Sequence, residues 1–357
     1  MSALSWIGSL WLAMAVVLGP IYGYVAYKIG YRWILISAVI CNTLALMMAS
    51  ISHEIWQLML TQGFLAGFGA SLAWFPCISA PQQYFSKRRG MAVGIAISGS
   101  GFGGLVMSNI VEAINKTLGI RWSLRVVGFI NLVLISFAAC VVRPLNPPPP
   151  CKFSQSLNLK PFRNVQFCLL FAVQFIGNFA FNVPSSYLPS YASYLQLDTW
   201  IGSNLSAILS GLMIVGKIGS GAVSDYIGRA NMCTICVSMT GVMCLALWLP
   251  ATNAAAIWAF AATFGLFGGG YMVMIPAVLV QCVGIEDVEA SNGLLFFAWF
   301  FGGLFGSPIC AALIGNDVDN PKYSDAIIFG GVLMVFAGCL CWAVRVLRAG
   351  WNPFIKA

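Results

Sequence analysis

Runs of about 20 apolar residues, separated by short polar stretches, recur along the whole chain. A helix that crosses a bilayer needs ~20 such residues, so each run predicts one membrane span. Five runs precede a proline-rich stretch and six follow it. The predicted spans are residues 6–26, 33–51, 57–79, 91–111, 123–142, 165–187, 204–224, 232–250, 255–280, 290–314 and 325–346.

One motif occurs twice in this pattern. The clearer copy, GLMIVGKIGSGAVSDYIGR at Gly211 to Arg229, is an apolar, glycine-rich segment that leads into a polar turn. The fainter copy, GPIYGYVAYKIGYR at Gly19 to Arg32, repeats the glycine spacing but has Tyr27 where the other has Asp225. Recurrence after roughly six spans indicates an internal repeat. The chain is therefore predicted to be an all-α polytopic membrane protein with two pseudo-repeated halves and eleven transmembrane helices.

The two predicted halves are residues 1–142 and 165–346. Residues 143–164 lie between them and contain four consecutive prolines, which favour an extended linker. A proline-rich run also serves as a ligand for partner domains, but a spacer between two helical bundles is the favoured interpretation. Residues 347–357 are predicted to form a short tail.

Composition agrees with a membrane protein, because 60% of the residues are hydrophobic and only 8% are charged. A soluble domain carries about 25% charged residues. The net charge of +8 reflects basic residues that gather in the loops of one side, which the positive-inside rule makes cytoplasmic. These basic residues are Lys28, Arg32, Lys87, Arg88, Arg89, Arg143, Lys152, Lys160, Arg163, Arg229, Arg345, Arg348 and Lys356. The carboxyl terminus is thus predicted to be cytoplasmic, the default location is the plasma membrane, and no nucleic-acid partner is needed.

No catalytic arrangement stands out. His53 is the single histidine, and the twelve cysteines are scattered without the spacing of a metal site. No glycine-rich phosphate loop occurs either. The sequence therefore predicts neither an enzyme nor a metal or cofactor site. The predicted partners are membrane lipid and a small-molecule substrate, and the oligomeric state is left open.

Lys217 is the most informative polar residue within a span, since it lies eight residues before Asp225 and ~12 Å inside the membrane. A buried cation needs an anion, and no acidic residue falls near mid-span, so a substrate anion is the favoured partner. The alternative is a side chain that extends back to the cytoplasmic interface.

Further substrate-binding candidates lie on two other spans. Asn178, Asn182 and Tyr187 surround Pro184, and interrupted helices often bind substrates in transporters. A simple kink is an equal alternative. Asn292 and Trp299 are seven residues apart and share one helical face that is predicted to line a cavity. For a single tryptophan in a span such as Trp299, ordinary packing is the favoured role, and the same holds for Trp74 and Tyr271.

Glycines cluster in the span GIAISGSGFGG, where small residues let two helices approach closely. The cluster is interpreted either as a contact along which two helices slide or as static close packing. The predicted helix-packing glycines are Gly94, Gly99, Gly101, Gly103 and Gly104.

Two glycosylation sequons occur. Asn115 begins the first, in a stretch predicted to be an external loop. Asn204 begins the second and is the weaker candidate, because it lies at the mouth of a span.

The turn formed by Gly221, Asp225, Gly228 and Arg229 is similar to the loop signature GxxxDxxGR of the major facilitator superfamily. More narrowly, the chain resembles the fungal members of the monocarboxylate porter family. The matching segments are YFSKRRGMAVGIAISGSGFGG at Tyr84 to Gly104, GIRWSLR at Gly119 to Arg125 and FNVPSSYLPSYASYL at Phe181 to Leu195.

This resemblance implies alternating access around a central site. The four turn residues would belong to a cytoplasmic gate, and Lys217 would take the position of a substrate-facing arginine in related porters. Two features depart from the family pattern. Met213 stands where an acidic partner of that cation is expected, and the family's first helix is missing from the predicted spans.

The leading prediction is a secondary active transporter of a small organic anion such as a monocarboxylate, with proton coupling as a further expectation. One alternative is an efflux transporter for a fungal secondary metabolite. The alternative from another class is a non-transporting membrane sensor or an inactive truncated porter.

Overall fold

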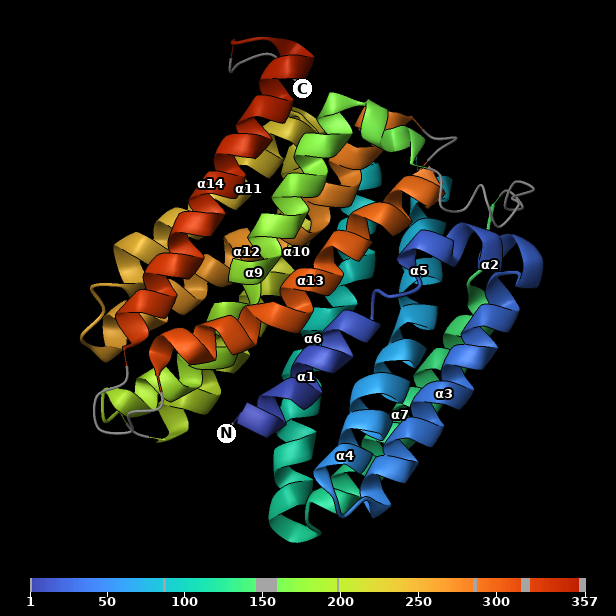
Figure 1. Ribbon diagram of the computed structural model, residues 1–357, viewed down its shortest axis with the longest axis vertical. Coiled ribbons are helices and arrows are strands. Elements are labelled where there is room, and N and C mark those ends of the chain that lie inside the picture. The colour runs from blue at the N-terminus through green and yellow to red at the C-terminus, as the bar shows by residue number, and fades with distance from the viewer. Residues whose placement is uncertain are drawn as a thin grey trace.

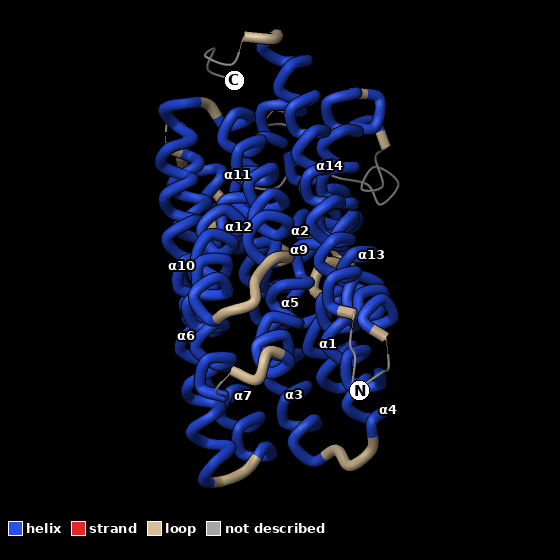
Figure 2. Tube along the Cα trace, turned by 90° about the vertical axis from the view of Figure 1, so that its left-hand side faces the viewer, coloured by secondary structure: helices blue, strands red, loops and turns tan. Residues whose placement is uncertain are grey.

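The computed structural model describes residues 2–85, 88–145, 159–197, 199–284, 288–315 and 322–352. Within these ranges the chain consists of helices joined by short turns, and none of the described residues forms a strand (Figures 1 and 2). A bilayer core offers no water to backbone N–H and C=O groups. The apolar segments therefore fold as helices that satisfy these groups internally.

Two groups of helices follow each other along the chain. Those before the proline-rich stretch are α1 (Ser2–Met14), η1 (Gly19–Ile21), α2 (Tyr22–Ile29), α3 (Tyr31–Ile51), α4 (Ile55–Leu58), η2 (Met59–Leu65), α5 (Ala66–Tyr84), α6 (Arg89–Thr117) and α7 (Ile120–Val141). Those after it are η3 (Lys160–Arg163), α9 (Val165–Tyr194), α10 (Thr199–Ile227), α11 (Arg229–Met243), η4 (Cys244–Trp248), α12 (Ala254–Val283), α13 (Val288–Ile314) and α14 (Tyr323–Ala349).

The described residues contain 11 helical segments that are long and apolar enough to cross a membrane, and each overlaps one predicted run. This confirms the predicted all-α architecture. Several helices extend past the predicted ends, most clearly α5 to Tyr84 and α9 to Tyr194. α9 also continues through Pro184, so the proline does not end the helix. Residues 146–158 of the predicted linker and 353–357 of the predicted tail lie outside the described part of the chain.

The first predicted span corresponds to the segment Trp6–Ile29, but its helix is interrupted. α1 ends at Met14, and the chain passes through a turn and η1 before α2 begins at Tyr22. Pro20 lies at the start of η1, where the missing N–H of proline is tolerated. Within this interruption, the backbone N–H of Leu18 donates to the side-chain hydroxyl of Ser71 on α5 at 3.3 Å.

Each helix packs mainly on one or two others. α3 packs against α7, α11 against α14, α10 against α12, and α9 against both α13 and α14. The two groups of helices meet where α6 packs against α10 and where α1 packs against α13 (Figure 1). These two contacts bring together spans that are far apart in sequence.

The repeated motif ends in the same turn both times. Gly30 precedes α3 with φ of +81°, and Gly228 precedes α11 with φ of +99°. A side chain is strained at such positive φ values, which explains the glycine in both copies. In Figure 1 the connection between α2 and α3 lies toward the same end of the molecule as the carboxyl-terminal end of α14.

Candidate functional site

Side chains of α5 and α13 meet in a contact that we call the α5–α13 seam, formed by Trp74, Gln82, Asn292, Phe296 and Trp299. At one level of this seam, the side-chain amide of Asn292 donates to Oε1 of Gln82 at 3.1 Å. Both side chains are buried, with 3% and 5% of their surface exposed. The pair is a neutral polar link between the two groups of helices.

A second level of the seam is aromatic. The ring centroids of Trp74 and Trp299 are 6.1 Å apart with an interplanar angle of 77°, an edge-to-face arrangement. Phe296 stacks on Trp299 at 5.9 Å and meets Trp74 edge-on at 6.2 Å. Three large rings from two helices therefore contact one another.

Several buried polar atoms of α5 and α13 have no hydrogen-bond partner among the described residues. A buried polar atom without a partner costs about 1–3 kcal/mol, so each one calls for an explanation. Those in or beside the seam are Nε1 of Trp74, Nε2 of Gln82, Oγ of Ser291, Oδ1 of Asn292 and Nε1 of Trp299. The seam thus presents hydrogen-bonding groups that the protein itself does not use.

Asn178 and Asn182 extend this site onto α9. Asn178 is fully buried, and its side-chain amide donates to the backbone carbonyl of Trp299 at 2.9 Å. The amide of Asn182 donates to Oδ1 of Asn178 at 3.4 Å. Tyr187 lies further along α9 and donates to the carbonyl of Ser307 at 2.7 Å. The structure therefore brings Asn178, Asn182 and Trp299 together, and each of the α9 candidates bonds to another protein group.

Lys217 lies at a different contact, between α10 and α6. Only 2% of its surface is exposed, and its amino group donates to Oγ of Ser100 at 2.6 Å and to the carbonyl of Ile97 at 3.4 Å. It does not extend to the interface. Both of these partners are neutral groups of the protein. No side chain of α9 or α12 carries a charge, so these two neighbours of α10 offer it no carboxylate.

The predicted gating turn lies at the end of α10. Asp225 Oδ1 and a guanidinium nitrogen of Arg229 are 3.8 Å apart, and both side chains are mostly buried. A Cβ atom on Gly221 would meet the carbonyl of Gly90 on α6 at 2.5 Å. The turn is therefore tied closely to the start of α6.

Three of the five predicted packing glycines face α10. A Cβ on Gly94 would meet the carbonyl of Lys217, one on Gly101 would meet Ile214 at 2.5 Å, and one on Gly104 would meet Ser210 at 3.4 Å. Gly99 and Gly103 point elsewhere, since a Cβ on either would meet no atom within 4 Å. One face of α6 therefore carries the close packing.

The sequons lie on helices. Asn115 belongs to the last turn of α6 and not to a loop, and its side-chain oxygen accepts from Oγ of Ser123 at 2.6 Å. Asn204 lies within α10.

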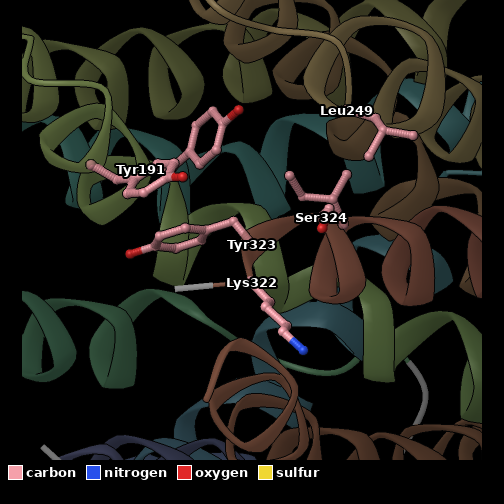
Figure 3. A pocket seen from close by; sticks show the side chains of 7 residues that line it. Tyr191, Leu249, Lys322, Tyr323 and Ser324 are labelled. Atoms are coloured by element: carbon pink, nitrogen blue, oxygen red, sulfur yellow. The ribbon is translucent and has the colours of Figure 1, made fainter. Parts of the chain in front are cut away.

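A cavity of about 260 Å³ lies beside α9, about one helical turn beyond Tyr187 (Figure 3). It is lined by Tyr191 and Tyr194 of α9, Leu249, and Lys322, Tyr323, Ser324 and Ile327 at the start of α14. No predicted site residue lines it. No group of three or more potential metal-ligating side chains occurs among the described residues.

Three seam residues were not predicted as binding candidates. Gln82 and Phe296 were not singled out, and Trp74 was assigned to packing. The available signal was weak: Gln82 is a polar residue near the end of an apolar segment, eight positions after Trp74. Its contact with Asn292 spans more than two hundred residues of sequence and depends on tertiary structure.

The chain is similar to known proteins over nearly its whole length. The sequence profile described as Major Facilitator Superfamily matches residues 1–307. The MFS transporter asaE of Aspergillus flavus is 31% identical over 356 residues, which cover 99% of this chain and 80% of that protein. The Fujikurins efflux protein of Gibberella fujikuroi is 30% identical, with coverage of 97% and 74%. The Aspyridones efflux protein apdF of Emericella nidulans is 29% identical, with coverage of 97% and 70%.

A solved structure shows the same fold. The proton:xylose symporter XylE, bound to 6-bromo-6-deoxy-D-glucose, superposes with a TM-score of 0.77 over 96% of this chain and 86% of that chain. Its sequence identity is 14%, so the similarity concerns the fold alone.

These findings support the resemblance to the major facilitator superfamily but not the narrower resemblance to monocarboxylate porters. The relatives are named as MFS transporters and efflux proteins, and the resemblance to monocarboxylate porters is not supported. Superfamily members are transporters and not enzymes, in agreement with the lack of a catalytic arrangement in the sequence. On the match over residues 1–307, together with the fold, this chain belongs to the major facilitator superfamily.

Proposed function

We propose that the protein is an efflux transporter for a fungal secondary metabolite, located in the plasma membrane. The observation that carries this proposal is the chemistry of the α5–α13 seam, which combines aromatic rings with neutral polar groups. Neither α5 nor the part of α13 from Ser291 to Ile314 contains a charged residue. Binding sites for bulky organic molecules are mostly apolar and aromatic, with a few polar groups that fix orientation.

The names of the relatives support the same proposal. Two of them are named as efflux proteins, for fujikurins and for aspyridones. The transport of a small carboxylate would instead require a cation that faces the substrate. Among the residues that the structure describes, Lys217 is the lysine or arginine that lies farthest from both ends of its span, and its amino group donates to Ser100 and to the carbonyl of Ile97. Efflux therefore fits the site better than uptake of a monocarboxylate.

The alternating-access mechanism follows from the packing between the two groups of helices. We propose that the predicted halves, residues 1–142 and 165–346, rock about the α6–α10 and α1–α13 contacts. The close approach of glycine backbones at these contacts allows helices to shift with little steric resistance. The seam would then open to one side of the membrane at a time.

Deletion of the gene in its native host tests this function. We expect mass spectrometry to show at least one metabolite whose ratio of intracellular to extracellular amount rises several-fold, and a plasmid copy to restore the ratio. In parallel, yeast cells that express the protein should take up radiolabelled lactate no faster than cells with an empty vector. Unchanged metabolite ratios together with increased lactate uptake would replace efflux with monocarboxylate transport.

A further inference from the structure

The unpartnered polar atoms of the described chain are concentrated on α5 and α13. Nε1 of Trp74 and Nε1 of Trp299 are both buried, although Trp74 as a whole is only partly buried. Trp299 has 9% of its surface exposed. An indole N–H that is removed from water and left without an acceptor destabilises the protein. Trp248 has the same unpartnered N–H group, but only the rings of Trp74 and Trp299 contact each other across two helices, so that one acceptor from outside the protein could serve both groups.

The chemistry of these two groups restricts the ligand. An indole N–H is a donor and never an acceptor, so its partner must carry an oxygen or nitrogen lone pair. The two donors belong to two of the three rings, Trp74, Phe296 and Trp299, that contact one another, and such a group of rings favours a flat, apolar partner. The side chains of α5 and of residues 291–314 are uncharged, which disfavours an ionic ligand.

The amide pair of Gln82 and Asn292 in the seam adds complementary groups. In the Gln82–Asn292 pair, one amide N–H donor and one amide carbonyl oxygen are used, while Nε2 of Gln82 and Oδ1 of Asn292 have no partner among the described residues. A donor and an acceptor are therefore free at this level, whereas the tryptophan level offers donors alone. A ligand that extends along the seam would place its acceptor between the tryptophans.

We infer that the indole N–H groups of Trp74 and Trp299 bind an oxygen acceptor of the transported molecule, which is a neutral, flat aromatic or conjugated carbonyl compound. This inference rests on the proposed efflux function and specifies its substrate class. Trp74 and Trp299 thereby become residues that determine specificity.

A pair of matched probes tests the role of the donors. The compound 9-fluorenone is neutral and planar and carries one carbonyl oxygen, whereas fluorene has the same ring system without oxygen. Binding of each tritiated compound is measured to the full-length protein in nanodiscs, and binding to empty nanodiscs is subtracted. We expect the wild-type protein to bind 9-fluorenone about three- to tenfold more tightly than fluorene, the range that one or two hydrogen bonds supply.

Substitution to phenylalanine keeps an aromatic ring but removes the N–H group. Trp74→Phe and Trp299→Phe should each reduce the preference for 9-fluorenone, and the double variant should abolish it. Trp248→Phe is the matched control, because Trp248 is 1% exposed and its Nε1 also lacks a partner among the described residues, yet it packs on Tyr191 and Phe260. This control variant should keep the wild-type preference, and thermal unfolding checks that all variants are folded.

The inference is overturned if the wild-type protein binds the two probes equally, or if the double variant keeps the preference. Either result leaves the efflux function intact as long as deletion of the gene still traps a metabolite in the cell. If the deletion changes no metabolite, the proposed function fails independently of the probe experiment.

Discussion

The amino group of Lys217 on α10 lies 2.6 Å from the hydroxyl oxygen of Ser100 on α6, at a contact that joins the two groups of helices. This bond, with the longer one to the carbonyl of Ile97, makes Lys217 part of the helix packing. The sequence had suggested a substrate-facing cation at this position, and that role stays a prediction. The loss of Ser100 and the loss of Lys217 are therefore expected to change the stability of the protein by different amounts.

Removing Ser100 should be more harmful than removing Lys217. Ser100→Ala leaves the buried amino group with one long hydrogen bond, so we expect a loss of about 1–3 kcal/mol of stability. Lys217→Met keeps most of the side-chain volume and removes the buried cation, while the hydroxyl of Ser100 keeps its hydrogen bond to the carbonyl of Ile97 at 2.9 Å, so we expect little loss of stability. Thermal unfolding in detergent should show a lower Tm for Ser100→Ala alone. Metabolite efflux should persist in Lys217→Met, and its loss there would restore a substrate role for the lysine.

Glycine positions on α6 provide a second test. Gly94→Ala places a methyl group against the backbone carbonyl of Lys217, and the two helices must then separate. We expect a loss of about 1–3 kcal/mol of stability and slower transport. Gly99→Ala is the control on the same helix, because its methyl group meets no atom within 4 Å. Equal behaviour of the two variants in unfolding and efflux assays would show that this packing is unimportant.

Asn178 is expected to stabilise the contact of α9 with α13. Asn178→Ala removes the donor to the carbonyl of Trp299 and leaves a gap in a fully buried position. We therefore expect Asn178→Ala to lower stability by about 1–3 kcal/mol. Asn182→Ala should have a smaller effect on Tm, since its bond to Asn178 is 3.4 Å long and its side chain is only partly buried. A larger effect at Asn182 would reverse this assignment.

Asn115 is expected to remain unmodified despite its sequon. Only Leu118 and Gly119 separate α6 from α7, and Asn115 lies in the last turn of α6 with its side chain bonded to Ser123. Glycosylation acceptors belong to accessible loops. Treatment with peptide N-glycosidase F should therefore leave the electrophoretic mobility unchanged, as should Asn115→Gln. A mobility shift that Asn115→Gln abolishes would contradict this prediction and would place this turn outside the cell.

Much of the architecture could be predicted because membrane insertion depends on local properties. An apolar run of sufficient length forms a helix wherever it occurs, since the bilayer leaves its backbone no other partner. The run at 165–187 was recognised in this way, although α9 extends to Tyr194. The break near Gly19 was missed, because it depends partly on the hydrogen bond that Leu18 makes with Ser71.

The candidate site was predicted only in part. Asn292 and Trp299 were singled out from their shared helical face, and the structure places both in the seam. Their partners Gln82 and Trp74 come from a helix more than two hundred residues earlier, and no local pattern connects them. The same limit applies to Lys217, whose burial was expected but whose partner, Ser100, lies 117 residues away.

The amino-acid sequence by itself determined the membrane class, the number of apolar helices among the described residues and the repeated glycine turn at Gly30 and Gly228. These features follow from hydropathy and backbone conformation, which each short segment carries on its own. Only the tertiary structure decided that Lys217 binds Ser100, that Gly94 and not Gly99 packs on α10, and that Trp74 faces Trp299. Those relationships depend on how helices rotate and cross when they pack, and lipid-facing and protein-facing positions are equally apolar in sequence.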